Sequence, residues 1–132
     1  MATIANFRDL DAWRVAMDLV VRVSALAHRL PPNEQFGLSA QIRRASVSIP
    51  SNIAEGQASG PGRRNLYHVR IALGSLAELE TQLEIARRLR LISEEDVKDI
   101  SAVLARTGQL LNGMARSLRL HGIGAAAADR RR

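Results

Sequence analysis

Arginine carries most of the chemistry that this sequence offers. Lys98 is the only lysine among the 19 basic residues, all the others being arginine, and the net charge is +6. The planar guanidinium binds two phosphate oxygens at once and stacks on bases, so the excess indicates a polyanionic partner such as nucleic acid. A GC-rich genome that encodes Arg wherever a solvated cation suffices explains any single arginine better, but it does not explain the overall excess.

Two pairs of adjacent arginines and one single arginine are the candidate nucleic-acid contacts. They are Arg43, Arg44, Arg63, Arg64 and Arg70, with a further contribution from the Arg130 to Arg132 tail. The glycine-rich stretch 56–62 precedes the second pair, which suits phosphate binding at a helix start. It lacks the Lys-Ser/Thr of a P-loop and follows no strand, so it is a poor NTPase signal. Aromatic residues make up only 3% of the chain, so binding is predicted to follow charge and shape.

The other chemically active residue types form no pattern that predicts catalysis or metal binding. The chain has no cysteine, which excludes disulfides, thiolate metal sites and cysteine nucleophiles. No histidine lies three residues from a glutamate, as the Glu-x-x-His pair of di-iron bundles requires. Glu78, Glu80 and Glu84 form a carboxylate set, but without a partner histidine they favour a solvated or arginine-paired face, and Arg87 and Arg88 lie one turn beyond Glu84. Instead of contacting nucleic acid, Arg43 can equally be a structural residue held by Glu78 or Glu80. We predict no enzyme activity, no metal and no cofactor.

The most informative stretch is residues 41–56, where polar side chains surround a proline. Ser48, Asn52 and Glu55 keep to one stripe of a helix, together with Arg44. A polar stripe opposite an apolar face is usually only solvent-exposed, but serine, asparagine and glutamate around a kink fit a specific hydrogen-bond network better. Of the three interpretations, we favour a hydrogen-bond network that fixes the bundle. A merely solvent-exposed stripe comes second, and a catalytic role comes third. Whether Arg44 and Glu55 pair within one chain or between subunits is open.

Four amphipathic helices are predicted to position these residues. Apolar residues recur at three- and four-residue spacings over about residues 7–30, 38–55, 62–89 and 93–121. Two prolines end the first helix, glycines flank the second, and Ser93 caps the fourth. The first and third helices carry a second apolar stripe, which predicts neighbours on two sides. Short loops between such helices favour an all-α fold, an up-and-down antiparallel four-helix bundle.

Four positions are predicted to shape the helices. Pro50 removes one backbone hydrogen bond and is expected to kink the second helix without dividing it. Gly74 costs about 1 kcal/mol in mid-helix, so a close backbone approach is expected there in compensation. Gly122 and Gly124 are expected to end the fourth helix.

The chain is predicted to be one domain at 1–121 followed by a flexible basic tail at 122–132. The N-terminus lacks a charged segment followed by an apolar run, so no signal peptide is expected. No stretch approaches about 18 uncharged apolar residues, so none is expected to span a membrane. A cytoplasmic protein is the prediction.

The stretch 41–56 and its surroundings resemble a bacterial four-helix bundle family, whose first members are encoded in intervening sequences of 23S ribosomal RNA genes. The most specific run is Ser48-Ile49-Pro50-Ser51-Asn52-Ile53-Ala54-Glu55-Gly56. Further matches are Phe7-Arg8-Asp9-Leu10 with Trp13 and Ala16, Glu34 with Phe36-Gly37-Leu38, Gln41-Ile42-Arg43-Arg44-Ala45, and Ile71-Ala72-Leu73-Gly74-Ser75-Leu76 with Glu78-Leu79-Glu80. The structural motif residues are then Ser48, Pro50, Asn52, Glu55, Gly56, Gly74 and Glu78. The resemblance covers roughly residues 7 to 120.

Such proteins are implied to be four-helix bundles that assemble into rings, often pentamers. They are similar to the accessory subunit of diversity-generating retroelements, a pentameric basic barrel that binds nucleic acid and a reverse transcriptase. The first hypothesis is therefore a homo-oligomeric, pentameric scaffold that binds RNA or DNA non-specifically through phosphates. The alternative is an adaptor that docks a partner enzyme such as a reverse transcriptase, with no direct nucleic-acid role.

Overall fold

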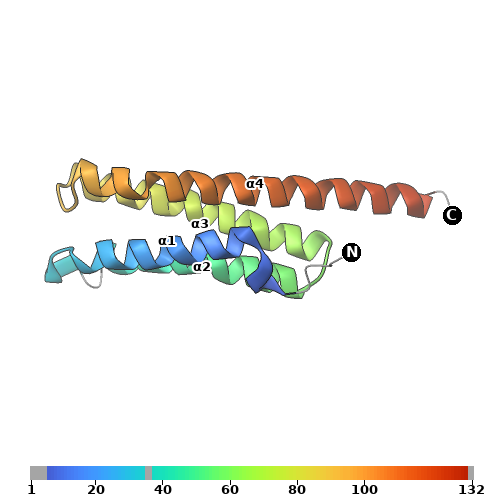
Figure 1. The fold of residues 1–132 in the computed structure, drawn as a ribbon, viewed down its shortest axis with the longest axis horizontal. Helices are drawn as coiled ribbons and strands as arrows, with labels where there is room; N and C mark the ends of the chain where they lie inside the picture. The colour runs from blue at the N-terminus through green and yellow to red at the C-terminus, as the bar shows by residue number, and fades with distance from the viewer. Residues whose placement is uncertain (1–5, 35–36, 131–132) are drawn as a thin grey trace.

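Four long helices run up and down the molecule (Figure 1). The computed structural model describes residues 6–34 and 37–130, and the side chains as far as residue 120. The helices are α1 (Asp11–His28), α2 (Leu38–Ala58), α3 (Arg63–Arg88) and α4 (Glu94–Arg130), with short 3-10 turns at Phe7–Asp9 and Pro32–Glu34. Each helix packs against the next, and α1 also packs against α4, which closes the bundle. The described residues form no strand, and the predicted all-α four-helix bundle is confirmed.

The core is built mainly from aliphatic side chains. Leu19, Ile49, Leu79 and Leu111, one from each helix, are fully buried. Burying a side chain of this size contributes roughly 2 kcal/mol, so these residues are a main source of the bundle's stability. On α4 the apolar residues recur at heptad spacing, and this heptad stripe faces the core, where its most buried members are Ile100, Leu104, Thr107 and Leu111.

On α1 and α3 a second stripe of apolar side chains lies partly outside the core. The inward stripe of α1 is Ala12, Ala16, Leu19, Val23 and Leu26. The other stripe of α1 is only partly covered, since Met17 is 38% exposed. On α3 the second stripe ends in Ile85 and Leu89, which are 43% and 61% exposed. The second apolar faces expected from the spacing therefore lie on the outside of the single chain.

Proline does not divide the second helix. Pro50 is buried inside α2, which continues unbroken on both sides of it. The hydroxyls of Ser46 and Ser51 donate to the carbonyl oxygens of Arg43 and Val47, each at 2.8 Å. These bonds lie within α2, one turn back along the helix, and they satisfy the buried hydroxyl of Ser46 and the exposed hydroxyl of Ser51 on the two sides of the proline.

The start of the first helix and the end of the second differ from the expected boundaries. The first helix begins at Asp11 rather than near Phe7, because the backbone at Leu10 is extended. The second helix runs through Gly56 to Ala58. The fourth begins as expected, with Ser93 Oγ accepting from the Asp96 amide and the Asp96 carboxylate accepting from the Ser93 amide, both at 3.0 Å.

The C-terminal end of α4 corrects the expectation for the last residues. The helix passes Gly122 and Gly124 and continues to Arg130, so the prediction that these glycines end it is wrong. Each glycine costs about 1 kcal/mol in a helix, but the four alanines that follow are the best helix formers and offset part of that cost. The segment 122–132 thus begins within α4, and its last two residues lie outside the described ones.

Candidate nucleic-acid interface

A chain of hydrogen bonds joins α2 to α3. The hydroxyl oxygens of Ser48 and Ser75 lie 2.8 Å apart. The Asn52 amide nitrogen donates to the carbonyl oxygen of Ser48 at 2.8 Å, and its Oδ1 lies 2.9 Å from Nδ1 of His68. Because an amide oxygen only accepts, the His68 ring carries a proton on Nδ1. A carboxylate oxygen of Glu55 lies 3.5 Å from the same nitrogen.

Gly56 brings the end of α2 against the start of α3. A Cβ at this position would lie 2.6 Å from Oδ1 of Asn65 and 3.0 Å from Cβ of His68. Asn65 is buried at 4% exposure, and its Oδ1 has no hydrogen-bond partner among the described residues. The absence of a Cβ therefore sets the separation of the two helices here. This contact and the hydrogen-bond chain fix the first turns of α3, which carry Arg63 and Arg64.

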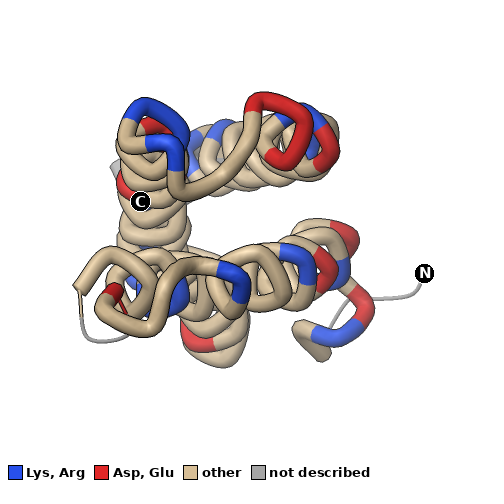
Figure 2. The backbone as a smooth tube through the Cα atoms, turned by 90° about the vertical axis from the view of Figure 1, so that its left-hand side faces the viewer, with Lys and Arg blue, Asp and Glu red and all other residues tan. Residues whose placement is uncertain are grey.

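Ion pairs gather at the end of the bundle where α3 turns into α4. Arg87 reaches Glu84 at 2.7 Å and Glu94 at 3.3 Å. Arg88 also pairs with Glu84, at 2.9 Å, so the ion-paired face expected for this glutamate is confirmed. Figure 2 looks at this end of the molecule and shows basic and acidic positions intermixed. The positive charge of these arginines is therefore largely compensated locally.

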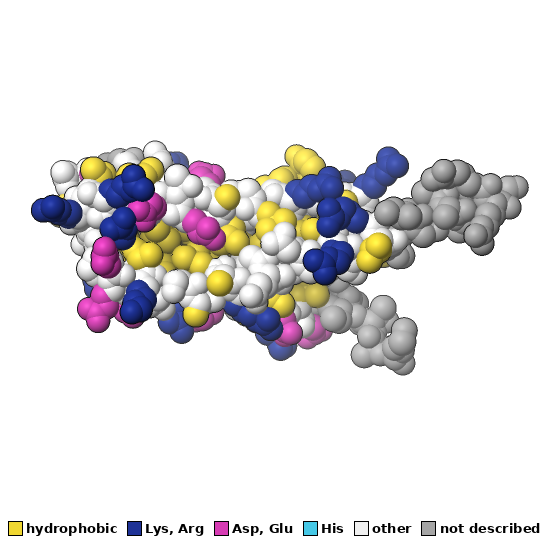
Figure 3. All heavy atoms as spheres, turned by 90° about the horizontal axis from the view of Figure 1, so that it is seen from above, with side chains coloured by type: hydrophobic (Ala, Val, Ile, Leu, Met, Phe, Trp, Pro, Cys, Tyr) yellow, Lys and Arg dark blue, Asp and Glu magenta, His cyan; other side chains and the backbone are white. Residues whose placement is uncertain are grey.

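The opposite end of the bundle carries arginines that have no acidic partner. This group, called the basic end below, consists of Arg63, Arg64 and Arg70 on α3 and Arg116 and Arg119 on α4. All five side chains are exposed, and none makes an ion pair within the described part of the chain. Figure 3 shows dark-blue side chains gathered at this end of one face, without magenta ones between them.

The antiparallel register brings the two helices' arginines to the same level. A Cβ on Gly108 of α4 would lie 3.4 Å from Leu76 of α3, so these two residues are opposite each other. Both helices rise about 1.5 Å per residue, so an equal count from that point pairs Tyr67 with the neighbourhood of Arg116 and Arg119. The arginines of α3 and α4 therefore lie at the same level along the bundle axis.

Only part of the predicted set of contacts lies at the basic end. Arg63, Arg64 and Arg70 belong to it, whereas Arg43 and Arg44 stand in the first half of α2, toward the other end of the bundle. Arg43 is half-buried beside the α1–α2 connection, and no ion pair joins it to Glu78 or Glu80 in the described structure. Arg44 is exposed and pairs with neither Glu55 nor another described carboxylate. Sequence reasoning missed the two α4 arginines.

Of the structural motif residues, Gly74 differs from expectation and Glu78 adds little to the interface. Gly74 is exposed, and a Cβ added to it would meet nothing within 4 Å, so the expected close backbone approach does not occur within the chain. The spacing alone could not show that Gly74 faces away from the other helices. Glu78 is also exposed, and its carboxylate accepts a 3.1 Å hydrogen bond from Gln82.

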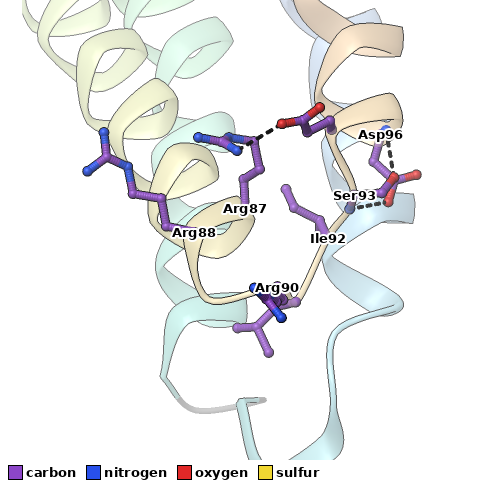
Figure 4. Close-up of a pocket in the computed structure, with 8 residues that line it drawn as sticks. Arg87, Arg88, Arg90, Ile92, Ser93 and Asp96 are labelled. Carbon is purple, nitrogen blue, oxygen red and sulfur yellow. Dashed lines mark hydrogen bonds and ion pairs between the residues drawn. The ribbon is translucent and has the colours of Figure 1, made fainter.

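The hollow at the α3–α4 turn is not a free anion site. It is lined by Arg87, Arg88, Arg90, Leu91, Ile92, Ser93, Glu94 and Asp96. Figure 4 shows Arg87 extending to a carboxylate across the turn, while Arg88 and Arg90 point away from it. The guanidinium that faces the hollow is therefore already paired.

Hydrogen bonds from Arg87 and Arg88 lower the pKa of Glu84 from 4.5 to about 2.

This pKa predicts an acid-dependent loss of stability. A carboxylate whose pKa is lower in the folded state stabilises the fold above its unfolded value, and that contribution is lost as pH falls through the folded value. We expect Glu84→Gln to remove part of the decline in unfolding free energy between pH 4.5 and about 2. Urea unfolding at several pH values in that range measures it, and parallel curves for the two proteins would contradict the assignment.

Other kinds of site find no support in the described side chains. Those residues contain no group of three or more histidine, aspartate or glutamate side chains placed to hold a metal ion. Among the described residues, no helix has the length and apolarity needed to cross a membrane.

The comparison with known proteins agrees with the fold and the motif. A family model described as 23S rRNA-intervening sequence protein matches residues 8–113, which includes α1, α2, α3 and the first half of α4. No curated protein matches the chain. The family match covers most of the sequence and all the residues of the α2–α3 hydrogen-bond chain. The chain therefore belongs to the 23S rRNA-intervening sequence protein family.

Proposed function

We propose that this protein is a homo-oligomeric helical scaffold whose basic end binds RNA or DNA through phosphates. The observation that carries the proposal is the uneven distribution of charge: five exposed arginines without acidic partners lie at one end, while Arg87 and Arg88 at the other end are ion-paired. An exposed guanidinium without a carboxylate partner is free to bind phosphate and to release counterions from the nucleic acid. Phosphate contacts carry no base identity, so sequence preference is weak. The role is one of binding, not catalysis.

Assembly of several chains would strengthen this interaction. A ring repeats the basic end once per subunit, and the summed field attracts polyanions more strongly than one copy does. The exposed apolar side chains of α1 and α3, including Met17, Val21, Ile85 and Leu89, support contacts between subunits. Five subunits is the number that the family resemblance implies.

Paired substitutions in the full chain test the location of the interface. Arg63→Gln with Arg64→Gln is compared with Arg43→Gln with Arg44→Gln, because both double variants lose two positive charges from adjacent positions. The expected result is a large loss of affinity for the first pair and a small one for the second. The salt dependence of binding should also weaken for the first pair, by about one unit of slope per arginine removed.

Fluorescence anisotropy across a salt series provides the measurement, with light scattering on the same samples to count subunits. Equal losses from the two double variants would mean that net charge, not the basic end, attracts nucleic acid. No binding of any RNA or DNA at low salt by a well-folded oligomer would reject the nucleic-acid function.

The second candidate function is an adaptor that docks a partner enzyme such as a reverse transcriptase. The exposed apolar side chains Val47 on α2 and Ile85 on α3 favour it, since such positions can pack against another protein. Apolar docking changes little with added salt, whereas phosphate binding weakens steeply. A partner complex that persists at high salt, from a protein that binds no nucleic acid, would support the adaptor.

A further inference from the structure

Tyr67 lies on α3 between Arg63 and Arg70 of the basic end and is unusually exposed for an aromatic residue. Its side chain is 62% exposed on α3. Arg63 precedes it by four residues and Arg70 follows it by three, so all three lie on one face of the helix. The helix rise puts the two arginines about 10 Å apart along the axis, with the ring between them. An aromatic ring is thus flanked by two cations that lack acidic partners.

The ring of Tyr67 is free to take a stacking partner. Its one ring contact among the described residues is edge-on to the neighbouring His68, with centroids 5.5 Å apart and planes at 73°. By contrast, Trp13 is half-buried and packs against Phe7 at 5.3 Å, and Arg8 already lies over the Phe7 ring at 4.6 Å. Of the aromatic residues that the structure describes, Tyr67 is the one with an accessible face.

The α4 side of the basic end extends the same surface. Leu120 is 64% exposed and, by the antiparallel register, lies at the level of Arg64. The surface therefore combines guanidinium groups with an aromatic and an aliphatic side chain. Duplex nucleic acid presents phosphates to such a surface but keeps its base faces stacked inside. Single strands present both phosphates and the faces of unpaired bases.

We infer that the basic end binds single-stranded nucleic acid, with an unpaired base stacked on the Tyr67 ring and the flanking phosphates bound by Arg63 and Arg70. The inference rests on the proposed function and narrows its substrate class. Stacking on the Tyr67 ring accepts any base, because every base has a π face. The hydroxyl of Tyr67 is not required for stacking, so phenylalanine should replace it.

The experiment uses the full-length protein and three probes of equal length: an oligothymidylate of ~20 nucleotides, a strand with the same number of phosphates but abasic sites in its middle, and a duplex. Tyr67→Ala is expected to weaken oligothymidylate binding about ten-fold or more, and duplex binding by less than about two-fold. Tyr67→Phe should bind like the natural protein. The natural protein should bind the abasic strand about as weakly as Tyr67→Ala binds oligothymidylate.

The remaining outcomes separate the two proposals. If Tyr67→Ala binds every probe like the natural protein while the Arg63 and Arg64 double variant loses affinity, the stacking inference is overturned and the phosphate interface stands. Tighter binding of duplex than of oligothymidylate by the natural protein would also overturn it. If no probe binds at low salt, both the inference and the nucleic-acid function fail.

Discussion

Gly56→Ala is expected to lower the free energy of unfolding by about 2 kcal/mol. The added methyl would lie 2.6 Å from Oδ1 of Asn65, 3.0 Å from Cβ of His68 and 3.2 Å from the Asn65 carbonyl oxygen. Asn65 is buried and short, and the other two atoms belong to or adjoin the backbone of α3, so the helices must separate to admit it. That separation outweighs the gain of about 1 kcal/mol that alanine brings to a helix.

Gly74→Ala is the matched control for this substitution. It makes the same chemical change in mid-helix, but a Cβ there meets nothing within 4 Å. Only the propensity gain applies, so the single chain should become more stable by about 1 kcal/mol. Urea unfolding of the two variants beside the natural protein gives both values. A stabilised Gly56→Ala protein would show that the close approach of α2 and α3 is not tight.

Asn52→Ala is expected to lower the free energy of unfolding by about 1.5 kcal/mol. Asn52 donates to the carbonyl and the hydroxyl of Ser48 and faces His68, and alanine makes none of these bonds. His68 then loses the nearer acceptor for its Nδ1–H and is left with the Glu55 carboxylate oxygen 3.5 Å away, in a site where the His68 side chain is 13% exposed. Exchanging the 2.9 Å hydrogen bond of a mostly buried donor for this longer contact, together with the lost bonds to Ser48, costs more than alanine returns in helix propensity.

Ser51→Ala tests whether this loss belongs to the α2–α3 contact or to any polar residue of α2. Ser51 is exposed, and its hydroxyl donates only to the Val47 carbonyl one turn back, so its removal should change stability by less than about 0.5 kcal/mol. A double-mutant cycle with His68→Ala should show coupling between Asn52 and His68. Additive effects in that cycle would mean that the 2.9 Å contact contributes nothing.

Much of the fold follows from local sequence signals. Three signals each depend on residues close together in the sequence, so they can be recognised without the structure. They are the prolines after α1, the capping pair Ser93 and Asp96, and the heptad stripe of α4. The polar stripe of α2 likewise indicated a hydrogen-bond network that fixes the bundle, and Ser48, Asn52 and Glu55 all contact α3. The partners themselves, His68 and Ser75, carry no such signal, because only the register of α2 against α3 selects them.

Features that depend on how the helices face one another could not be predicted from the sequence. The glycine that approaches a neighbouring helix is Gly56 in the last turn of α2, not Gly74 in the middle of α3. The basic end combines Arg63 and Arg116, which are far apart in sequence and meet because α3 and α4 run in opposite directions. From the sequence, Arg43 and Arg63 were equally good candidate contacts, because the local spacing of residues does not show at which end of the bundle each one lies.

The uneven placement of charge also makes the molecule a permanent electric dipole. In an up-and-down bundle the backbone dipoles of neighbouring helices oppose one another, so the side chains set its direction along the bundle axis. A distant polyanion exerts a torque on such a molecule as well as a pull, and turns the arginines toward itself before contact. The protein is therefore already oriented when it meets the polymer. Its α1–α2 and α3–α4 connections then face away from the polymer and stay open to solvent.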